Sequence, residues 1–150
     1  MVSSRRRYSE LVQALEHGGY RLTPQRDAVL RVLADVAQHF SAEQIYAQAR
    51  QRCRSTSRAT VYNTITVLKH LGEVEDLEFS ALGHRYAGRA PGLRAHLVCT
   101  RCGRIEDFDR PELETDLAAA AAASSFRVAL CRLDLYGECP ACQGQEDRSE

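Results

Sequence analysis

Two Cys-x-x-Cys pairs constrain the fold of this chain more than any other feature of its sequence. One pair is Cys99 and Cys102, and the other is Cys139 and Cys142. Two intervening residues make a tight turn that directs both sulfur atoms to one point, and four thiolates satisfy the tetrahedral coordination of one Zn²⁺. Because residues 103–138 separate the pairs, the ion is expected to join two strands across a small folded domain. Four thiolate ligands leave no coordination position for a substrate.

A redox dithiol is the alternative interpretation of each Cys-x-x-Cys pair. The first twenty residues contain arginines but no apolar segment of the kind that a secretory signal carries. In a cytoplasmic chain, six cysteines indicate metal or thiol chemistry rather than disulfides. No apolar run is long enough to span a membrane. We therefore expect a cytoplasmic protein without a membrane partner.

The net charge of zero conceals a difference between the two halves of the chain. Residues 1–72 carry eleven Arg and Lys against five Asp and Glu, a net charge of +6. Residues 73–150 carry nine against fifteen, a net charge of −6. The first half is therefore suited to a polyanion such as nucleic acid, and the length of 150 residues allows two small domains.

Start and stop signals divide the first half into helices. Thr23 before Pro24 is an N-cap signal, and Ser41 with Gln44 forms a capping box. Glycines follow the first and the last helix, as is common at helix ends. The predicted helices cover residues 9–16, 24–36, a segment that begins after Ser41, and 58–71.

The last of these helices has one apolar face, formed by Val61, Ile65 and Leu68. The opposite face is small and polar and would not obstruct entry into a DNA groove. Residues 74–79 and 84–88 then read as a hairpin. Helices followed by a two-stranded wing predict a winged helix-turn-helix, whose last helix enters the major groove.

The second half predicts a small α+β domain. Strands are expected at 96–100, 104–108 and 126–137, with an alanine-rich helix at 111–124. The predicted organisation is a winged-helix domain at 1–88, a hinge at 89–94, a dimerisation and metal-binding domain at 95–143, and a polar tail at 144–150.

Five segments of the chain resemble the ferric uptake regulator (Fur) family of bacterial metal-responsive transcription factors. They are RLTPQR (21–26), HFSAEQIY (39–46), SRATVYNTITVLKHLG (57–72), HLVCTRCGRIEDF (96–108) and LDLYGECPAC (133–142). The resemblance implies an N-terminal DNA-binding domain and a dimerisation domain with structural zinc. It also implies a homodimer that binds a pseudo-palindromic double-stranded operator.

The resemblance also implies which residues contact DNA. Tyr62 matches a tyrosine that contacts thymine methyl groups, and Asn63 is suited to adenine or to a phosphate. Asn63 resembles the asparagine of the peroxide-sensing branch of the family. Arg21 matches a residue that reaches the minor groove, while Arg58 and Thr60 are expected to contact phosphates. Packing of Tyr62 against a neighbouring helix is the structural alternative.

A second, regulatory metal site is implied near the hinge, with ligands from both domains. His39, His96 and Asp107 match family ligands. Two further ligand positions differ, because the chain has Arg94 and Ala87 there.

His84 is the nearest candidate for a replacement ligand, and its alternative is a solvated strand residue. Together with the three matching ligands it gives a mixed nitrogen and oxygen set, which suits Fe(II) or Mn(II) and tolerates Zn(II). Fe(II) or Mn(II) is the expected regulatory ion. A further metal site of some relatives keeps only Glu114 and has Cys131 in place of a histidine. Cys131 is expected to be an inert strand residue, and a soft metal ligand or a redox thiol are the alternatives.

These patterns predict a metal-dependent repressor of metal-uptake or oxidative-stress genes, which acts as a homodimer and has no enzymatic activity or small-molecule substrate. One alternative is a constitutive repressor whose regulatory site has decayed. The other is a thiol redox protein that acts through Cys-x-x-Cys.

Overall fold

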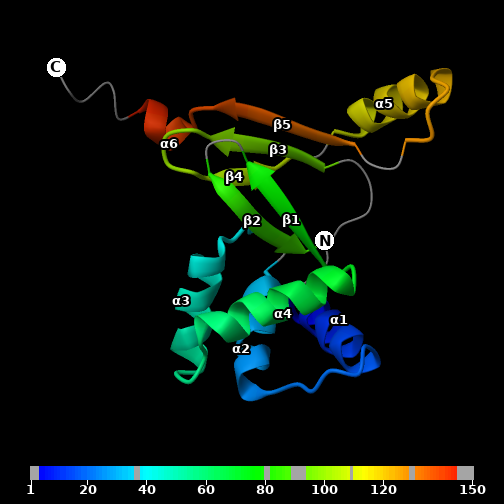
Figure 1. Ribbon diagram of the computed structural model, residues 1–150. Coiled ribbons are helices and arrows are strands. Elements are labelled where there is room, and N and C mark those ends of the chain that lie inside the picture. Colours follow the sequence, from blue (N-terminus) through cyan, green and yellow to red (C-terminus); the bar gives the residue numbers. More distant parts are fainter. Residues whose placement is uncertain are drawn as a thin grey trace. The chain divides into compact units, whose positions relative to one another are not determined.

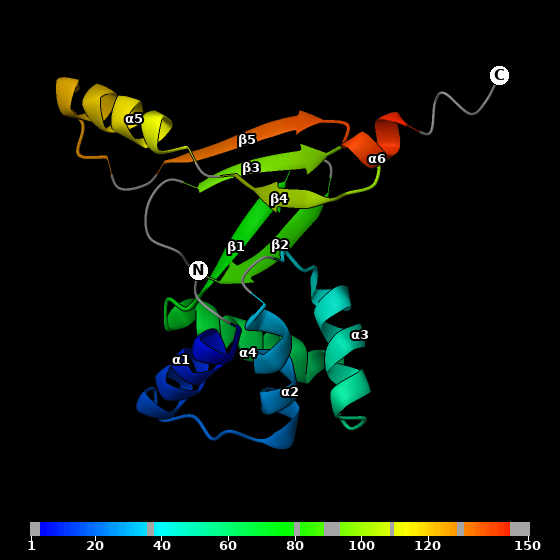
Figure 2. The same ribbon diagram turned by 180° about the vertical axis from the view of Figure 1, so that it is seen from behind.

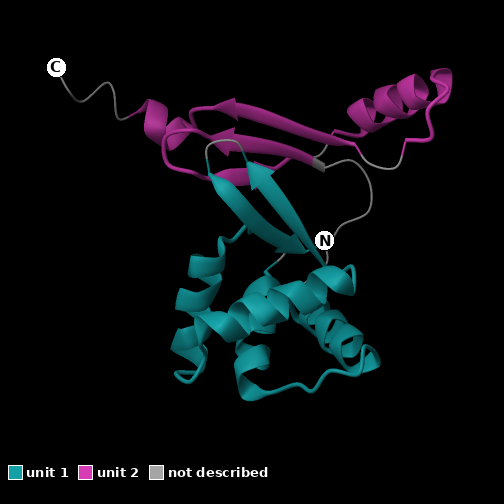
Figure 3. Cartoon of the chain, in the orientation of Figure 1, with its two compact units in different colours: residues 1–89 teal, residues 90–150 magenta. Residues whose placement is uncertain are grey.

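The computed structural model describes residues 4–35, 38–79, 82–88, 94–108, 110–128 and 131–144. The chain divides into two compact units, residues 1–89 and 90–150 (Figure 3). Each unit is described by itself below. Most of the predicted hinge, 89–94, and of the predicted tail, 144–150, lies outside the described residues.

Unit 1 contains four helices followed by a hairpin (Figure 1). The strands pair antiparallel, with Val74 opposite Gly88 and Phe79 opposite Gly83. This arrangement confirms the predicted winged helix-turn-helix. The elements are α1 (Ser4–His17), α2 (Pro24–Leu33), α3 (Ala42–Arg52), α4 (Arg58–His70), β1 (Val74–Phe79) and β2 (Gly83–Gly88).

The core of unit 1 is built from the apolar faces of its four helices. The face of α4 predicted from Val61, Ile65 and Leu68 is fully buried in this core. Because α4 buries one face, the opposite face is left at the surface, where Tyr62 is 50% exposed. Other members of the core include Leu11, Leu15, Val29, Leu33 and Ile45.

Two helix boundaries in unit 1 differ from the prediction. Helix α1 begins at Ser4 rather than Ser9, because Arg7 in its first turns is buried and bonds to the side chain and carbonyl of Glu73. The first turn of α1 is polar and is held by the Glu73 carboxylate, so the sequence there has no apolar period that would predict a helix. Helix α2 ends at Leu33, with Ala34 as its C-cap, and the predicted end at Val36 lies outside the described residues.

The capping box at the start of α3 is present. The Gln44 backbone N–H donates to Ser41 Oγ at 3.2 Å, and the Ser41 N–H donates to Gln44 Oε1 at 2.8 Å. We expect Ser41→Ala to lower the free energy of unfolding by about 1 kcal/mol, measured by urea denaturation. Ser9→Ala, at an exposed position inside α1, serves as a control that should change it by less than about 0.5 kcal/mol. Equal stability of the two variants would contradict the capping role.

Unit 2 contains a three-stranded sheet with the order β4–β3–β5. Strand β3 (Arg94–Cys99) is central, antiparallel to β4 (Ile105–Asp107) and parallel to β5 (Arg132–Gly137). Parallel neighbours require a long crossover connection, and α5 (Pro111–Ala123) lies in it, as both views show (Figures 1 and 2). The short helix α6 (Pro140–Gln143) follows β5. These elements confirm the predicted α+β class.

The last strand is shorter than the predicted 126–137. Residues 126–128 are irregular, and Phe126 and Val128 are 81% and 53% exposed. Alternating apolar residues do not form a strand without a neighbouring strand to pair with, and among the described residues of 126–137 it is those from Arg132 onward that pair with β3. Cys131 is half-buried and directly precedes β5. Over the described residues, no helix is both long and apolar enough to cross a membrane.

Candidate metal centre and nucleic-acid interface

The four predicted zinc ligands of unit 2 lie together. The sulfur atoms of Cys99 and Cys142 are 3.8 Å apart, those of Cys102 and Cys139 are 3.7 Å apart, and all four lie within 4.8 Å of one another. Tetrahedral zinc with Zn–S bonds of about 2.3 Å requires sulfur separations of about 3.8 Å. The cluster therefore has the dimensions of a closed four-thiolate zinc site, and all four thiols are free rather than disulfide-bonded.

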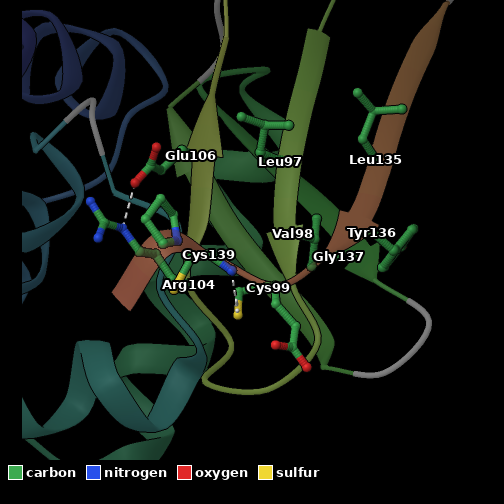
Figure 4. A pocket seen from close by; sticks show the side chains of 11 residues that line it. Leu97, Val98, Cys99, Arg104, Glu106, Leu135, Tyr136, Gly137 and Cys139 are labelled. Carbon is green, nitrogen blue, oxygen red and sulfur yellow. Dashed lines mark hydrogen bonds and ion pairs between the residues drawn. The ribbon is translucent and has the colours of Figure 1, made fainter. Parts of the chain in front are cut away.

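The backbone shapes this cluster locally. Gly103, immediately after the first pair, has φ of +77°, a conformation that residues with a Cβ rarely adopt. Its N–H donates to the Cys99 carbonyl at 3.0 Å, which closes the turn. The Cys139 N–H donates to Cys99 Sγ at 3.3 Å (Figure 4). A donor aimed at sulfur stabilises the thiolate form that a metal requires.

The thiols of this cluster have unequal proton affinities. Backbone N–H groups of Cys102 and Cys139 lower the pKa of Cys99 to about 6. Burial raises the pKa of Cys142 to about 12. A buried thiol of this kind becomes a thiolate when a cation is bound beside it, so metal binding must release a proton.

A hollow of about 200 Å³ lies beside the cysteine cluster in unit 2. Its lining includes the apolar side chains Leu97, Leu135 and Tyr136, which are 43–46% exposed. Figure 4 shows them with Arg104 and Glu106, whose side chains form an ion pair at 2.5 Å. Large apolar side chains at a surface mark a candidate site for protein contact.

Two of the predicted regulatory ligands are neighbours in the sheet of unit 2. His96 in β3 pairs directly with Asp107 in β4, and His96 Nε2 lies 3.5 Å from Asp107 Oδ1. Two ligands of one tetrahedral ion, with bonds of about 2.1 Å, are about 3.4 Å apart. These nitrogen and oxygen donors therefore fit a shared divalent cation, although an ion pair with protonated His96 would have the same geometry.

The two predicted ligands in unit 1 have different surroundings. His39 is 8% exposed and packs edge-on against Phe79, with ring centroids 6.4 Å apart. The His84 side chain is 56% exposed, and its Nδ1 lies 2.7 Å from Asp76 Oδ1. Asp76 also accepts from Lys69 Nζ at 2.6 Å. His84 thus contacts a surface carboxylate that also pairs with Lys69, and its role as a ligand stays a prediction.

Three of the predicted DNA-contacting residues line one polar hollow of about 580 Å³ in unit 1. Arg21 precedes α2, whereas Thr60 and Asn63 lie in the first turns of α4. Gln25 and Arg26 also line this hollow, and the sequence analysis did not identify them as candidate DNA contacts. Their position after Pro24, in the first turn of α2, was the signal that could have indicated them.

The other two predicted contacts lie on the exposed part of α4. Tyr62 is half-exposed rather than packed in the core. The Arg58 guanidinium makes two bonds to Glu43, at 2.9 and 3.1 Å, and lies 4.4 Å from the centroid of the Tyr46 ring. Arg58 is therefore held at the surface by α3, and a phosphate would compete with Glu43 for it.

Several arginines of unit 1 are not neutralised by a carboxylate. Within the described residues Arg21, Arg26, Arg50 and Arg54 form no ion pair. By contrast, Arg6, Arg7, Arg31 and Arg58 each contact an Asp or Glu. The first four arginines lie around the start of α2 and the end of α3, where each can contribute positive potential.

Asp134 is a further residue of unit 2 that the sequence analysis missed. It lies opposite His96 in β5, and its Oδ1 is 2.8 Å from His96 Nδ1. The local sequence contains no signal for this contact, because the register of parallel strands joined through α5 is set by tertiary packing.

Comparison with known proteins identifies the family. The model of the ferric uptake regulator family matches residues 17–136. The peroxide-responsive repressor PerR of Staphylococcus aureus is 34% identical over 134 residues, which cover 89% of this chain and 90% of that protein.

Solved structures of the same family have a similar fold. The Helicobacter pylori ferric uptake regulator, described as having three functional metal-binding sites, aligns with a TM-score of 0.77 and 26% identity over 93% of each chain. The Vibrio cholerae ferric uptake regulator aligns with a TM-score of 0.73 and 29% identity, covering 85% of this chain and 98% of that chain. These relatives are transcription regulators and not enzymes, so the thiol-enzyme alternative is not supported. The winged helix, the four-cysteine cluster and these similarities together show that the chain belongs to the ferric uptake regulator family.

Proposed function

We propose that this protein is a cytoplasmic, metal-dependent repressor that binds pseudo-palindromic operator DNA as a homodimer and controls metal-uptake or oxidative-stress genes. The observation that carries the proposal is a hollow in unit 1 that brings Arg21, which precedes α2, together with Thr60 and Asn63 from the first turns of α4. Arg21 and Thr60 can bind phosphates of the DNA backbone and Asn63 can bind a base edge, a combination that is suited to a DNA groove. The unpaired arginines beside it would neutralise phosphates.

In this proposal the two units have different roles. Unit 1 reads DNA through Tyr62 and Asn63 and contacts the backbone through Arg21, Arg58 and Thr60. Unit 2 holds structural zinc with its four cysteines and forms the dimer. The exposed apolar side chains Leu97, Leu135 and Tyr136 of the sheet support a protein contact there.

A regulatory cation would be bound by His39, His84, His96 and Asp107, with Fe(II) or Mn(II) preferred to Zn(II). The cation supplies a positive charge that ligands from both units can share, which couples metal binding to DNA affinity. The mixed donor set fits a hard divalent ion. His96 and Asp107 are the part of the set for which the geometry gives support.

The decisive experiment is an operator titration. Duplexes selected from a random library by the zinc-loaded protein with Mn(II) would be titrated without added metal and with Mn(II), Fe(II) or Zn(II). We expect Mn(II) or Fe(II) to increase affinity about 5- to 150-fold, the usual range of coupling between two sites. His96→Ala is expected to abolish the increase. Unchanged affinity with every ion would overturn metal sensing and indicate a constitutive repressor, and no selected duplex at all would overturn DNA binding.

A further inference from the structure

Three residues form a row across the sheet of unit 2. His96 on the central strand is paired in register with Asp107 on one side and with Asp134 on the other. In-register neighbours project from the same face of a sheet. The imidazole of His96 therefore lies between two carboxylates, and its side chain is fully buried.

The two carboxylates are not equivalent. Asp134 Oδ1 lies 2.8 Å from His96 Nδ1, a full hydrogen-bond contact, whereas Asp107 Oδ1 lies 3.5 Å from Nε2. The Asp134 side chain is 17% exposed and that of Asp107 is 46% exposed. The less exposed carboxylate thus bonds to one ring nitrogen, and the more exposed carboxylate lies farther from the other nitrogen.

Asp134 is itself fixed by Arg132, two residues earlier on the same strand. Arg132 Nε donates to Oδ1 at 3.0 Å, and its Nη2 lies 2.6 Å from Oδ2. Both carboxylate oxygens are therefore engaged within the sheet, and the arginine compensates the charge of this partly buried carboxylate. This arrangement suits a group that orients a ligand rather than one that coordinates a metal directly.

We propose that Asp134 is a positioning residue that holds His96 with its proton on Nδ1 and its Nε2 lone pair available to the regulatory cation. A carboxylate can only accept at Nδ1, so the neutral ring must carry its proton there. Fixing the tautomer and the ring orientation of a histidine ligand raises its affinity for metal. The inference rests on the proposed function, because it assigns Asp134 a part in the regulatory site.

The test uses the full-length, zinc-loaded protein and Mn(II) as the probe. Asp134→Asn is expected to weaken Mn(II) binding 10- to 100-fold, measured by the electron paramagnetic resonance signal of free Mn(II). Glu106→Gln, which removes an equal charge from an exposed position on β4, is the control and should change the affinity less than threefold. Zinc content and thermal unfolding are measured for both variants, so that a misfolded variant is recognised.

A second readout reports the tautomer itself. Long-range ¹H–¹⁵N NMR of the Mn(II)-free protein is expected to show the Nδ1–H form of His96 in the original sequence and a mixture of tautomers in Asp134→Asn. An Nε2–H form in the original sequence would overturn the proposal, as would Mn(II) affinity in folded Asp134→Asn equal to that of the control. Both readouts are independent of DNA binding, so they separate a failure of this inference from a failure of the proposed repressor function.

Discussion

Replacing Cys142 by serine is expected to abolish zinc binding and to unfold unit 2 while unit 1 remains folded. Cys142 is 5% exposed and belongs to the four-thiolate cluster. Zinc in such a site contributes on the order of 10 kcal/mol to folding. Unit 2 has little else to hold it, because no side chain of α5 is buried and the sheet exposes several of its apolar residues.

Zinc per chain, measured by atomic emission, should fall from one to nearly zero in Cys142→Ser. Circular dichroism should then show one thermal transition, that of the helical unit 1, instead of two. Cys131→Ser is the matched control, because Cys131 lies outside the cluster and should leave zinc content unchanged. Removal of zinc from the original protein by a chelator should reproduce the effect. A Cys142→Ser protein that keeps its zinc and both transitions would show that the cluster is not a structural metal site.

The parts of the fold that depend on neighbouring residues were predictable from the sequence. The caps at Thr23 and Ser41 each accept a backbone N–H as predicted, since capping involves residues three positions apart. The buried face of α4 follows from the helical period alone. The cysteine cluster was equally predictable from the sequence, because two Cys-x-x-Cys pairs are typical of a structural zinc site.

The parts that depend on distant residues were not predictable. The early start of α1 depends on Glu73, whose carboxylate accepts a hydrogen bond from Arg7, 66 residues earlier in the chain. The start of β5 at Arg132 is set by its pairing with β3, and the same pairing places Asp134 opposite His96. The period of the sequence does not reveal the pairing of β3 with β5, because these strands are joined through α5 and meet only in the folded unit. The ligands of a site can therefore be predicted from sequence motifs, whereas residues that support a ligand, as Asp134 supports His96, can be identified only in the folded structure.

Replacing Arg21, Arg26, Arg50 and Arg54 together by glutamine is expected to remove most of the salt dependence of DNA binding. Each phosphate that an arginine neutralises adds about 0.9 to the slope of log affinity against log salt concentration. Four contacts in each protomer, or eight in the proposed homodimer, would account for a slope of about 7, which corresponds to a change in affinity on the order of 10⁴-fold between about 50 and 200 mM salt. Arg50 and Arg54 line a common hollow at the end of α3, so they are placed to contact one backbone segment.

The measurement is fluorescence anisotropy of a labelled operator across this salt range, with the metal concentration held constant. Arg54→Gln alone removes one contact from each protomer and should lower the slope by about 2. Arg6→Gln is the control, because Arg6 is 74% exposed and already paired with Glu10 at 3.1 Å, and it should leave the slope unchanged. If Arg54→Gln and Arg6→Gln had equal slopes, the arginines at the end of α3 would serve only to stabilise the carboxyl end of that helix. A slope that falls only for the unpaired arginines would instead extend the DNA-contacting surface beyond α4, from the start of α2 to the end of α3.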